Sequence, residues 1–181
     1  MTDHKHLLMH QERRRISDKE LLVAILSMGT YCTISLHDEP YPYIVPMNYG
    51  FKWEESLVFY LHMAVEGHRL ELIKKNPLVG INVSIYIDRV GKKKYRDESH
   101  DYRSVTAFGK AEIIDPRINQ EEFIHGLSVL NTHNERPPIK KISSVMLNQL
   151  YILKITADYI SGKAQYPIST MNEVKMPNPE D

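Results

Sequence analysis

Segments rich in β-branched and aromatic residues recur along most of the chain, and turns of hairpin length join most of them. This pattern constrains the fold, because strands joined by short turns pair antiparallel. The expected strands cover residues 30–37, 41–51, 56–63, 78–87, 102–114 and 151–159. Helical patterns are inserted over residues 67–75, 120–134 and 143–148. The order β-β-β-α-β-β-α-β predicts a mainly β (α+β) fold, an antiparallel barrel with helices packed at its ends, although periodicity alone does not separate a barrel from a sandwich.

A further helix is expected before the first strand. Ser17 and Glu20 form a capping box, with Ser17 at the N-cap and Glu20 three positions later. The apolar residues that follow at helical spacing are Leu21, Leu22, Ile25 and Leu26. Gly29 stands where a glycine in the left-handed conformation would end this helix.

Length and composition indicate one folded domain. The chain has 181 residues, of which 42% are hydrophobic and 25% charged, so a disordered or low-complexity chain is excluded. No internal repeat and no linker divides the sequence. We therefore expect a single domain over residues 1–165, followed by a polar, proline-punctuated tail over residues 166–181.

Charge and cysteine content limit the partners. Basic and acidic residues number 23 each, and this balance disfavours nucleic acid and anionic membranes as partners. No apolar run approaches the roughly 20 residues that span a bilayer, and the N-terminus has no apolar signal core. The single cysteine, Cys32, cannot form an intrachain disulfide and suits a reducing, cytoplasmic compartment. We expect no metal site, since His4, His6 and His10 lie on an end that we expect to be disordered.

Two interruptions of the strand pattern are candidates for function. In the segment 43–51, Asn48 and Gly50 interrupt an otherwise apolar strand, and a glycine there permits close approach of a backbone or a ligand. The alternative is an ordinary bulge with a hydrogen-bonded asparagine. In the segment 102–112, Arg103 and Ser104 open a strand that contains Gly109, and could bring donors to the same ligand. The alternative there is a plain strand with a glycine kink.

The start of the helix over residues 67–75 is the third candidate. His68 and Arg69 lie in its first turn, where cations oppose the positive end of the helix dipole. Two basic groups at that end are explained if an anion binds between them, since a phosphate would also accept hydrogen bonds from the backbone amides. The alternative is that both side chains are solvated on the surface.

Taken together, five pieces of the sequence resemble the flavin-binding split-barrel proteins related to pyridoxamine 5′-phosphate oxidase, and within them the nitroimidazole-resistance (Nim) branch. The pieces, in order, are residues 46–51 (PMNYGF), 59–70 (FYLHMAVEGHRL), 76–77 (NP), 102–111 (YRSV with GKA) and 160–164 (ISGKA). The resemblance covers about residues 16–164, and the order of the five pieces makes it specific.

The resemblance implies a six-stranded split β-barrel that forms a homodimer, with FMN, or alternatively FAD, bound at the subunit interface. It implies that His68 and Arg69 hold the phosphate and that Arg103 and Ser104 complete the pocket from the other subunit. The cofactor-binding residues that it implies are Val45, Pro46, Met47, Asn48, Tyr49, His62, Met63, His68, Arg69, Arg103 and Ser104.

The function implied is that of an FMN-dependent, nitroreductase-like oxidoreductase acting on a small-molecule electron acceptor such as a 5-nitroimidazole, which it reduces to a non-toxic amine. His62 is the implied catalytic residue, and a structural histidine is the alternative. Two other functions stay open: a non-catalytic flavin-binding redox sensor or carrier, and an interaction protein without flavin. Oxidation of pyridoxamine phosphate is not expected. The C-terminal segment of arginine and tryptophan that binds the pyridoxal ring is not found, and Trp53 is the only tryptophan.

Overall fold

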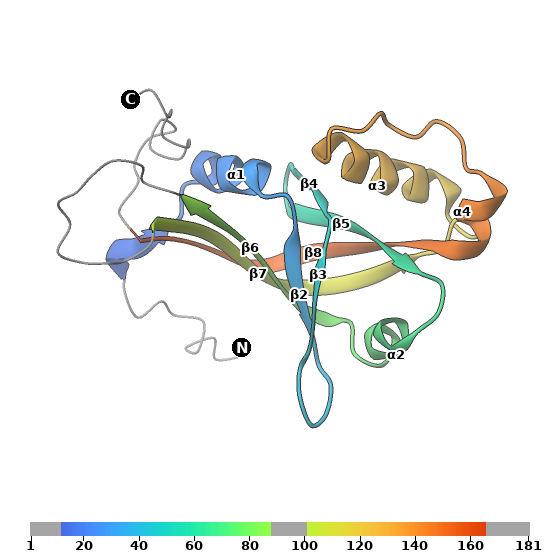
Figure 1. Ribbon diagram of the computed structural model, residues 1–181, viewed down its shortest axis with the longest axis horizontal. Helices are drawn as coiled ribbons and strands as arrows, with labels where there is room; N and C mark the ends of the chain where they lie inside the picture. Colours follow the sequence, from blue (N-terminus) through green and yellow to red (C-terminus); the bar gives the residue numbers. More distant parts are fainter. Residues whose placement is uncertain (1–11, 88–100, 166–181) are drawn as a thin grey trace.

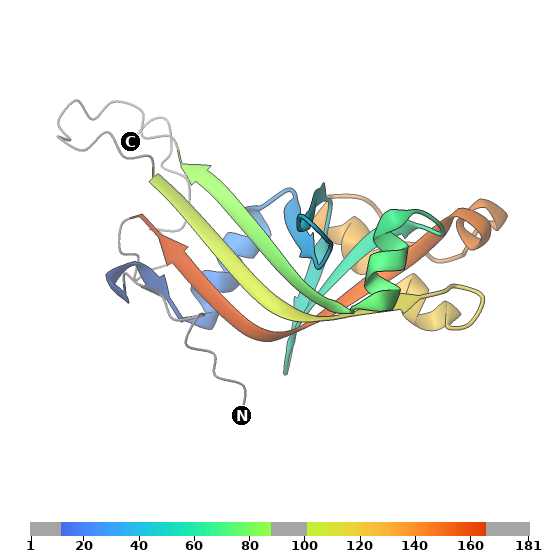
Figure 2. The ribbon, with the colours of Figure 1, turned by 90° about the horizontal axis from the view of Figure 1, so that it is seen from below.

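One antiparallel sheet organises the protein. The computed structural model describes residues 12–87 and 101–165. The strands are β1 (Arg15–Ile16), β2 (Cys32–Leu36), β3 (Tyr43–Met47), β4 (Gly50–Trp53), β5 (Leu57–Ala64), β6 (Leu78–Ile87), β7 (Asp101–Ile114) and β8 (Leu150–Ala164). Their order in the sheet is β3-β2-β6-β7-β8-β5-β4, and β1 pairs with β8 off this path. The long strands β6, β7 and β8 run side by side as one bent layer (Figures 1 and 2).

The two outermost strands of this order are consecutive in the sequence. β3 pairs with β2 at one edge and β4 pairs with β5 at the other, and only Asn48 and Tyr49 separate β3 from β4. The chain thus crosses between the two edges without a ladder between them, which makes an open, split barrel and confirms the predicted fold class.

The strand count differs from the expected six for two physical reasons. The segment 41–51, predicted as one strand, is divided by the crossing at Asn48 and Tyr49 into β3 and β4. The second addition is β1, a two-residue strand that is too short to leave a pattern in the sequence.

The helices lie around the sheet. They are the 3₁₀ turn η2 (Glu12–Arg14), α1 (Lys19–Met28), α2 (His68–Lys75), α3 (Gln120–His133) and α4 (Ser144–Gln149). α1 packs against β6 and β7, α2 against β2, and α3 against β4, β5 and β8. In Figure 1, α1 and α3 lie above the sheet and α2 lies below it.

Both predicted ends of α1 need correction. The N-cap is Asp18, not Ser17, and its carboxylate accepts a hydrogen bond of 3.0 Å from the Leu21 amide. Gly29 is extended, with φ −72° and ψ 136°, and not left-handed. Glycine occupies this position because there is no room for a side chain: a Cβ there would lie 2.4 Å from Cγ1 of Val83 and 2.6 Å from the Tyr49 hydroxyl.

Two apolar clusters fill the interior. The larger one joins the sheet to α1 and α2, and the smaller one joins α3 to the sheet around Phe123 and Ile152. Tyr49 is fully buried in the larger cluster, and its hydroxyl donates to the Leu26 carbonyl over 2.5 Å. The crossing between the sheet edges is therefore fixed to the C-terminal end of α1.

Gly50, at the start of β4, lets α3 approach the sheet closely. A Cβ at this position would lie 2.5 Å from the carbonyl oxygen of Val129 and 2.6 Å from Cα of Leu130. The sequence predicted that Gly50 would let a backbone or a ligand approach closely, and the group that approaches is the backbone of α3.

We expect Gly50→Ala to lower the free energy of unfolding by about 1–3 kcal/mol, the range for overpacking, because a helix backbone has to move. Gly80→Ala in β6 is the control, since its Cβ would meet no atom closer than 3.5 Å. It should change the free energy of unfolding by less than about 1 kcal/mol. Urea denaturation measures both, and equal effects would contradict this account of Gly50.

Candidate functional site

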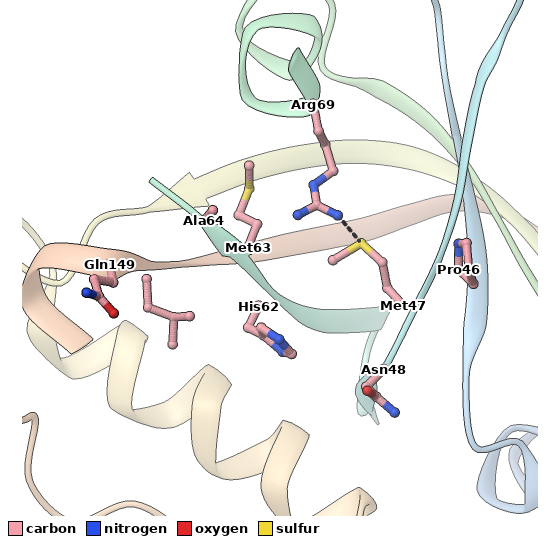
Figure 3. A pocket seen from close by; sticks show the side chains of 9 residues that line it. Pro46, Met47, Asn48, His62, Met63, Ala64, Arg69 and Gln149 are labelled. Atoms are coloured by element: carbon pink, nitrogen blue, oxygen red, sulfur yellow. Dashed lines mark hydrogen bonds between the residues drawn. The ribbon is translucent and has the colours of Figure 1, made fainter. Parts of the chain in front are cut away.

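A pocket of about 420 Å³ opens beside the crossing between the sheet edges. Its walls come from the end of β3, the second half of β5, the first turn of α2 and the junction of α4 with β8 (Figure 3). The lining residues are Pro46, Met47, Asn48, His62, Met63, Ala64, Arg69, Gln149 and Leu150. Six of the sequence-predicted residues therefore meet in one cavity: Pro46, Met47, Asn48, His62, Met63 and Arg69.

Arg69 carries the main charge of this pocket. Its side chain extends from α2 toward Met47 (Figure 3), and Nη1 donates to the Met47 sulfur over 3.2 Å. A thioether is a weak acceptor. Nε is buried and has no hydrogen-bond partner within residues 12–87 and 101–165. A half-buried guanidinium with donors so poorly satisfied is suited to binding an anion.

The start of α2 adds to this preference for an anion. Gly67 is the N-cap, with φ +112°, and it provides no side-chain hydrogen bond to the helix. The first amides of α2 therefore point outward without a side-chain acceptor, at the positive end of the helix dipole.

His68 lies in the same turn but is directed away from the pocket lining. Its Nε2 is 2.7 Å from Oδ2 of Asp38, in the turn between β2 and β3, and its ring packs edge-on to Tyr43. The two basic residues that the sequence predicts for one phosphate thus have different surroundings: Arg69 lines the cavity and His68 pairs with a carboxylate.

His62 lies on β5 opposite Ile152 of β8, with its side chain on the open side of the strand. Partial burial lowers the pKa of His62, and the positive charges of Arg69 and Arg136 lower it further. The imidazole is therefore neutral at neutral pH, with one donor and one acceptor nitrogen.

The remaining predicted residues lie outside the cavity of this chain. Val45 is half-buried in β3 and packs against the larger core, and the ring of Tyr49 is in that core. Arg103 and Ser104 lie at one end of β7, where Arg103 pairs with Ala164 in register. The pocket is near the other end, since Ile114 and His62 both pair with Ile152. The span from residue 103 to residue 114 is about 35 Å of strand.

Three lining residues were missed by the sequence analysis: Ala64, Gln149 and Leu150. Gln149 and Leu150 come from a short helix and a strand start more than 80 residues after His62. The β5–β8 ladder, in which Ala64 pairs with Leu150, brings them here. No local signal in the sequence shows that pairing.

Other candidate chemistry gains no support from the described residues. In residues 12–87 and 101–165, no three His, Cys, Asp or Glu side chains are placed to hold a metal ion. Over the same residues, no helix is long and apolar enough to cross a membrane. Cys32 is fully buried, and burial raises the pKa of its thiol to about 12, so it packs as an apolar residue. His4, His6, His10 and the tail over 166–181 lie outside the described residues.

Comparison with known proteins identifies the family. The sequence profile of the pyridoxamine 5′-phosphate oxidase family matches residues 18–164, and the chain belongs to this family. No curated protein sequence matches the chain significantly. The family and the split-barrel fold predicted from the five sequence pieces are confirmed.

Solved structures agree with this assignment. A candidate 5-nitroimidazole antibiotic resistance protein from Bacteroides thetaiotaomicron is 27% identical, with a TM-score of 0.67 over 83% of this chain and 86% of that one. An FAD-binding protein from Mesorhizobium loti is 19% identical (TM-score 0.58, 83% and 96% covered). An FAD and heme binding protein from Mycobacterium smegmatis is 18% identical (TM-score 0.66, 89% and 78% covered). The last two similarities show a shared fold.

The pair of Asp38 and His68 gives a prediction about stability. The hydrogen bond from His68 holds the pKa of Asp38 below its usual range. A depressed pKa means that the carboxylate stabilises the fold above pH 4 or so, and that this contribution disappears as the pH falls through the folded-state pKa. Asp38→Asn should thus lower the melting temperature at pH 6 by up to about 3 °C, the range for an exposed pair.

Thermal unfolding of wild type and variant should converge below about pH 3. Glu39→Gln is the matched control, because it removes the same charge from the neighbouring, exposed residue. A difference between wild type and Asp38→Asn that persisted unchanged in acid would rule out the pair as its cause.

Proposed function

We propose that this chain is a flavin-dependent oxidoreductase that binds FMN, with FAD possible, in the pocket between β3, β5 and α2. The observation that carries the proposal is Arg69, a half-buried guanidinium at a helix start whose one hydrogen bond to the described residues is to a thioether. A phosphate group would satisfy both the guanidinium and the outward-pointing amides. The flavoproteins among the structures of the same fold support the choice of ligand.

The composition of the pocket fits such a cofactor. Its volume of about 420 Å³ is within the range of about 300–1,000 Å³ for small-molecule sites. Apolar surface for a flat ring comes from Pro46, Met47, Met63 and Leu150, and no carboxylate is among the lining residues. An anionic, largely aromatic molecule therefore meets neither charge repulsion nor an unpaired acid.

The flavin supplies electron transfer when it is bound, and the chain supplies position and electrostatics. The neutral imidazole of His62 can donate a hydrogen bond to an oxygen of the electron acceptor, or pass it a proton. The Asn48 side chain is fixed beside it, with Nδ2 3.2 Å from the Thr30 carbonyl and 3.4 Å from Oδ1 of Asn134. These two groups orient an acceptor that enters the open side of the pocket.

We propose that the acceptor is a nitro compound such as a 5-nitroimidazole. Its reduction to the amine takes six electrons and six protons and releases two waters, so an external two-electron donor would have to reduce the flavin three times. The similarity to the Bacteroides thetaiotaomicron protein supports this acceptor. The second candidate is a non-catalytic flavin-binding redox carrier or sensor, which would use the same pocket without turnover. Reduction of nitro compounds by the purified holoprotein separates the two.

A homodimer belongs to the same proposal. Arg103 and Ser104 are too far along β7 to reach the pocket of their own chain, and a second subunit would bring them to it. Large apolar side chains are exposed along β6 and β7, as an interface would require. They are Leu78 (61% exposed), Tyr86 (57%) and Phe108 (40%).

Arg69→Ala should raise the dissociation constant of FMN by about 10- to 150-fold, the range for one lost hydrogen bond to a charged group. Flavin fluorescence during titration of the apoprotein measures it. Lys74→Ala is the matched control, since Lys74 lies on the same helix and pairs with Glu71. His68→Ala should have a smaller effect than Arg69→Ala, because His68 faces Asp38. An unchanged dissociation constant of FMN in Arg69→Ala would show that the phosphate binds elsewhere.

His62→Ala should leave FMN stoichiometry intact and slow reoxidation of the reduced protein by a nitroimidazole about 10²–10⁴-fold, the range for a positioned acid–base group. Stopped-flow mixing measures the rate. His37→Ala, at an exposed histidine outside the pocket, is the control. Loss of flavin from His62→Ala would assign His62 to cofactor binding, and an unchanged rate would make it structural.

A further inference from the structure

Hydrogen bonds connect the turn that follows α3 to the wall of the pocket. Asn134 caps α3, and its Nδ2 donates to the carbonyls of Tyr49, over 2.9 Å, and Leu130, over 2.7 Å. Its Oδ1 accepts from Asn48, which lines the cavity. The C-terminal end of α3 is thereby tied to both residues of the crossing between the sheet edges.

Arg136 is held by the same turn. Glu135 adopts a positive φ of 56°, which reverses the chain, and the Arg136 amide then donates to the Asn131 carbonyl over 2.8 Å. This backbone geometry places Arg136 two residues from the side chain that binds Asn48. Backbone and asparagine hydrogen bonds thus set the backbone position of Arg136, next to the turn that contacts the pocket residue Asn48.

The guanidinium of Arg136 has no structural role that would explain it. Its side chain is exposed, and among the described residues it makes no hydrogen bond or ion pair. Its charge nevertheless acts on His62, whose pKa it lowers together with Arg69. Two cations, Arg69 and Arg136, thus act on the pocket residue His62.

We propose that Arg136 and His62 form an outer subsite for the anionic group of the second ligand, so that the preferred electron acceptor is a small aromatic molecule with a carboxylate. The inference rests on the proposed function. With a phosphate bound at Arg69, the charge of that residue is engaged, and of the two arginines that act on His62, Arg136 is the one left for the acceptor. A carboxylate accepts hydrogen bonds from both the guanidinium and a neutral imidazole.

Two probes of nearly equal size test this inference, 4-nitrobenzoate and 4-nitrobenzamide. Calorimetric titration of the oxidised, FMN-loaded protein gives the dissociation constant of each without turnover. We expect 4-nitrobenzoate to bind about fivefold more tightly at low ionic strength, which corresponds to one partly screened charge pair. The preference should shrink in 0.5 M salt, because exposed pairs are screened. Arg136→Gln should abolish the preference while leaving FMN bound.

Lys52→Gln is the matched control. Lys52 is exposed on β4, pairs in register with Val58 in the first half of β5 and is outside the pocket lining. It removes the same charge and should keep the fivefold preference.

Equal binding of the two probes to the wild type, or a preference that survives Arg136→Gln, would overturn the inference and leave the proposed function standing. Loss of FMN from Arg136→Gln would also overturn it, since Arg136 would then be a cofactor anchor. A wild-type chain that binds no FMN would refute the proposed function, and this inference with it.

Discussion

Asn48 and Tyr49 carry the chain from one edge of the sheet to the other, and the arrangement of the pocket depends on that crossing. Tyr49 is anchored in the core by its hydroxyl bond to the Leu26 carbonyl of α1. Asn134 holds the Tyr49 carbonyl from the side of α3. Both helices therefore fix Tyr49, and Asn134 also accepts a hydrogen bond from Asn48. The end of β3 is thus held beside the second half of β5, and the cavity forms in the opening where no ladder joins the edges.

The electrostatics of the pocket follow from this position. Its lining includes a guanidinium and an imidazole but no carboxylate, so no acidic side chain of the lining neutralises Arg69. Its contact with the Met47 sulfur satisfies only part of its hydrogen-bonding capacity. A buried donor without an acceptor costs free energy in the folded protein, and an anionic ligand removes that cost. Such strain at a site is expected where binding, rather than stability, determines the residues.

Local sequence signals predicted the elements of the fold well. The strand over residues 78–87 and the helix that begins near residue 67 follow from β-branched content, from Gly67 and from the Asn76-Pro77 stop, and the structure has both as β6 and α2. The sequence did not predict that the segment 41–51 is divided between β3 and β4. Both halves read as strand, and only tertiary pairing with β2 and β5 separates them.

The candidate site was predicted in part. Residues close together in sequence, such as Pro46, Met47 and Asn48, were found through the family resemblance and do meet in the pocket. Gln149 was not found, because the β5–β8 ladder brings it there from a distant segment. The partner of His68 was missed for the same reason, since Asp38 lies 30 residues earlier in a turn.

The central claim is that this pocket binds the phosphate of a flavin, and riboflavin, which lacks the phosphate, tests it most directly. Titration of the full-length apoprotein with FMN and with riboflavin, followed by flavin fluorescence, gives the two dissociation constants under identical conditions. The account predicts that FMN binds at least about 10-fold more tightly, the lower limit for one hydrogen bond to a charged group. Equal dissociation constants, or no binding of FMN, would contradict it.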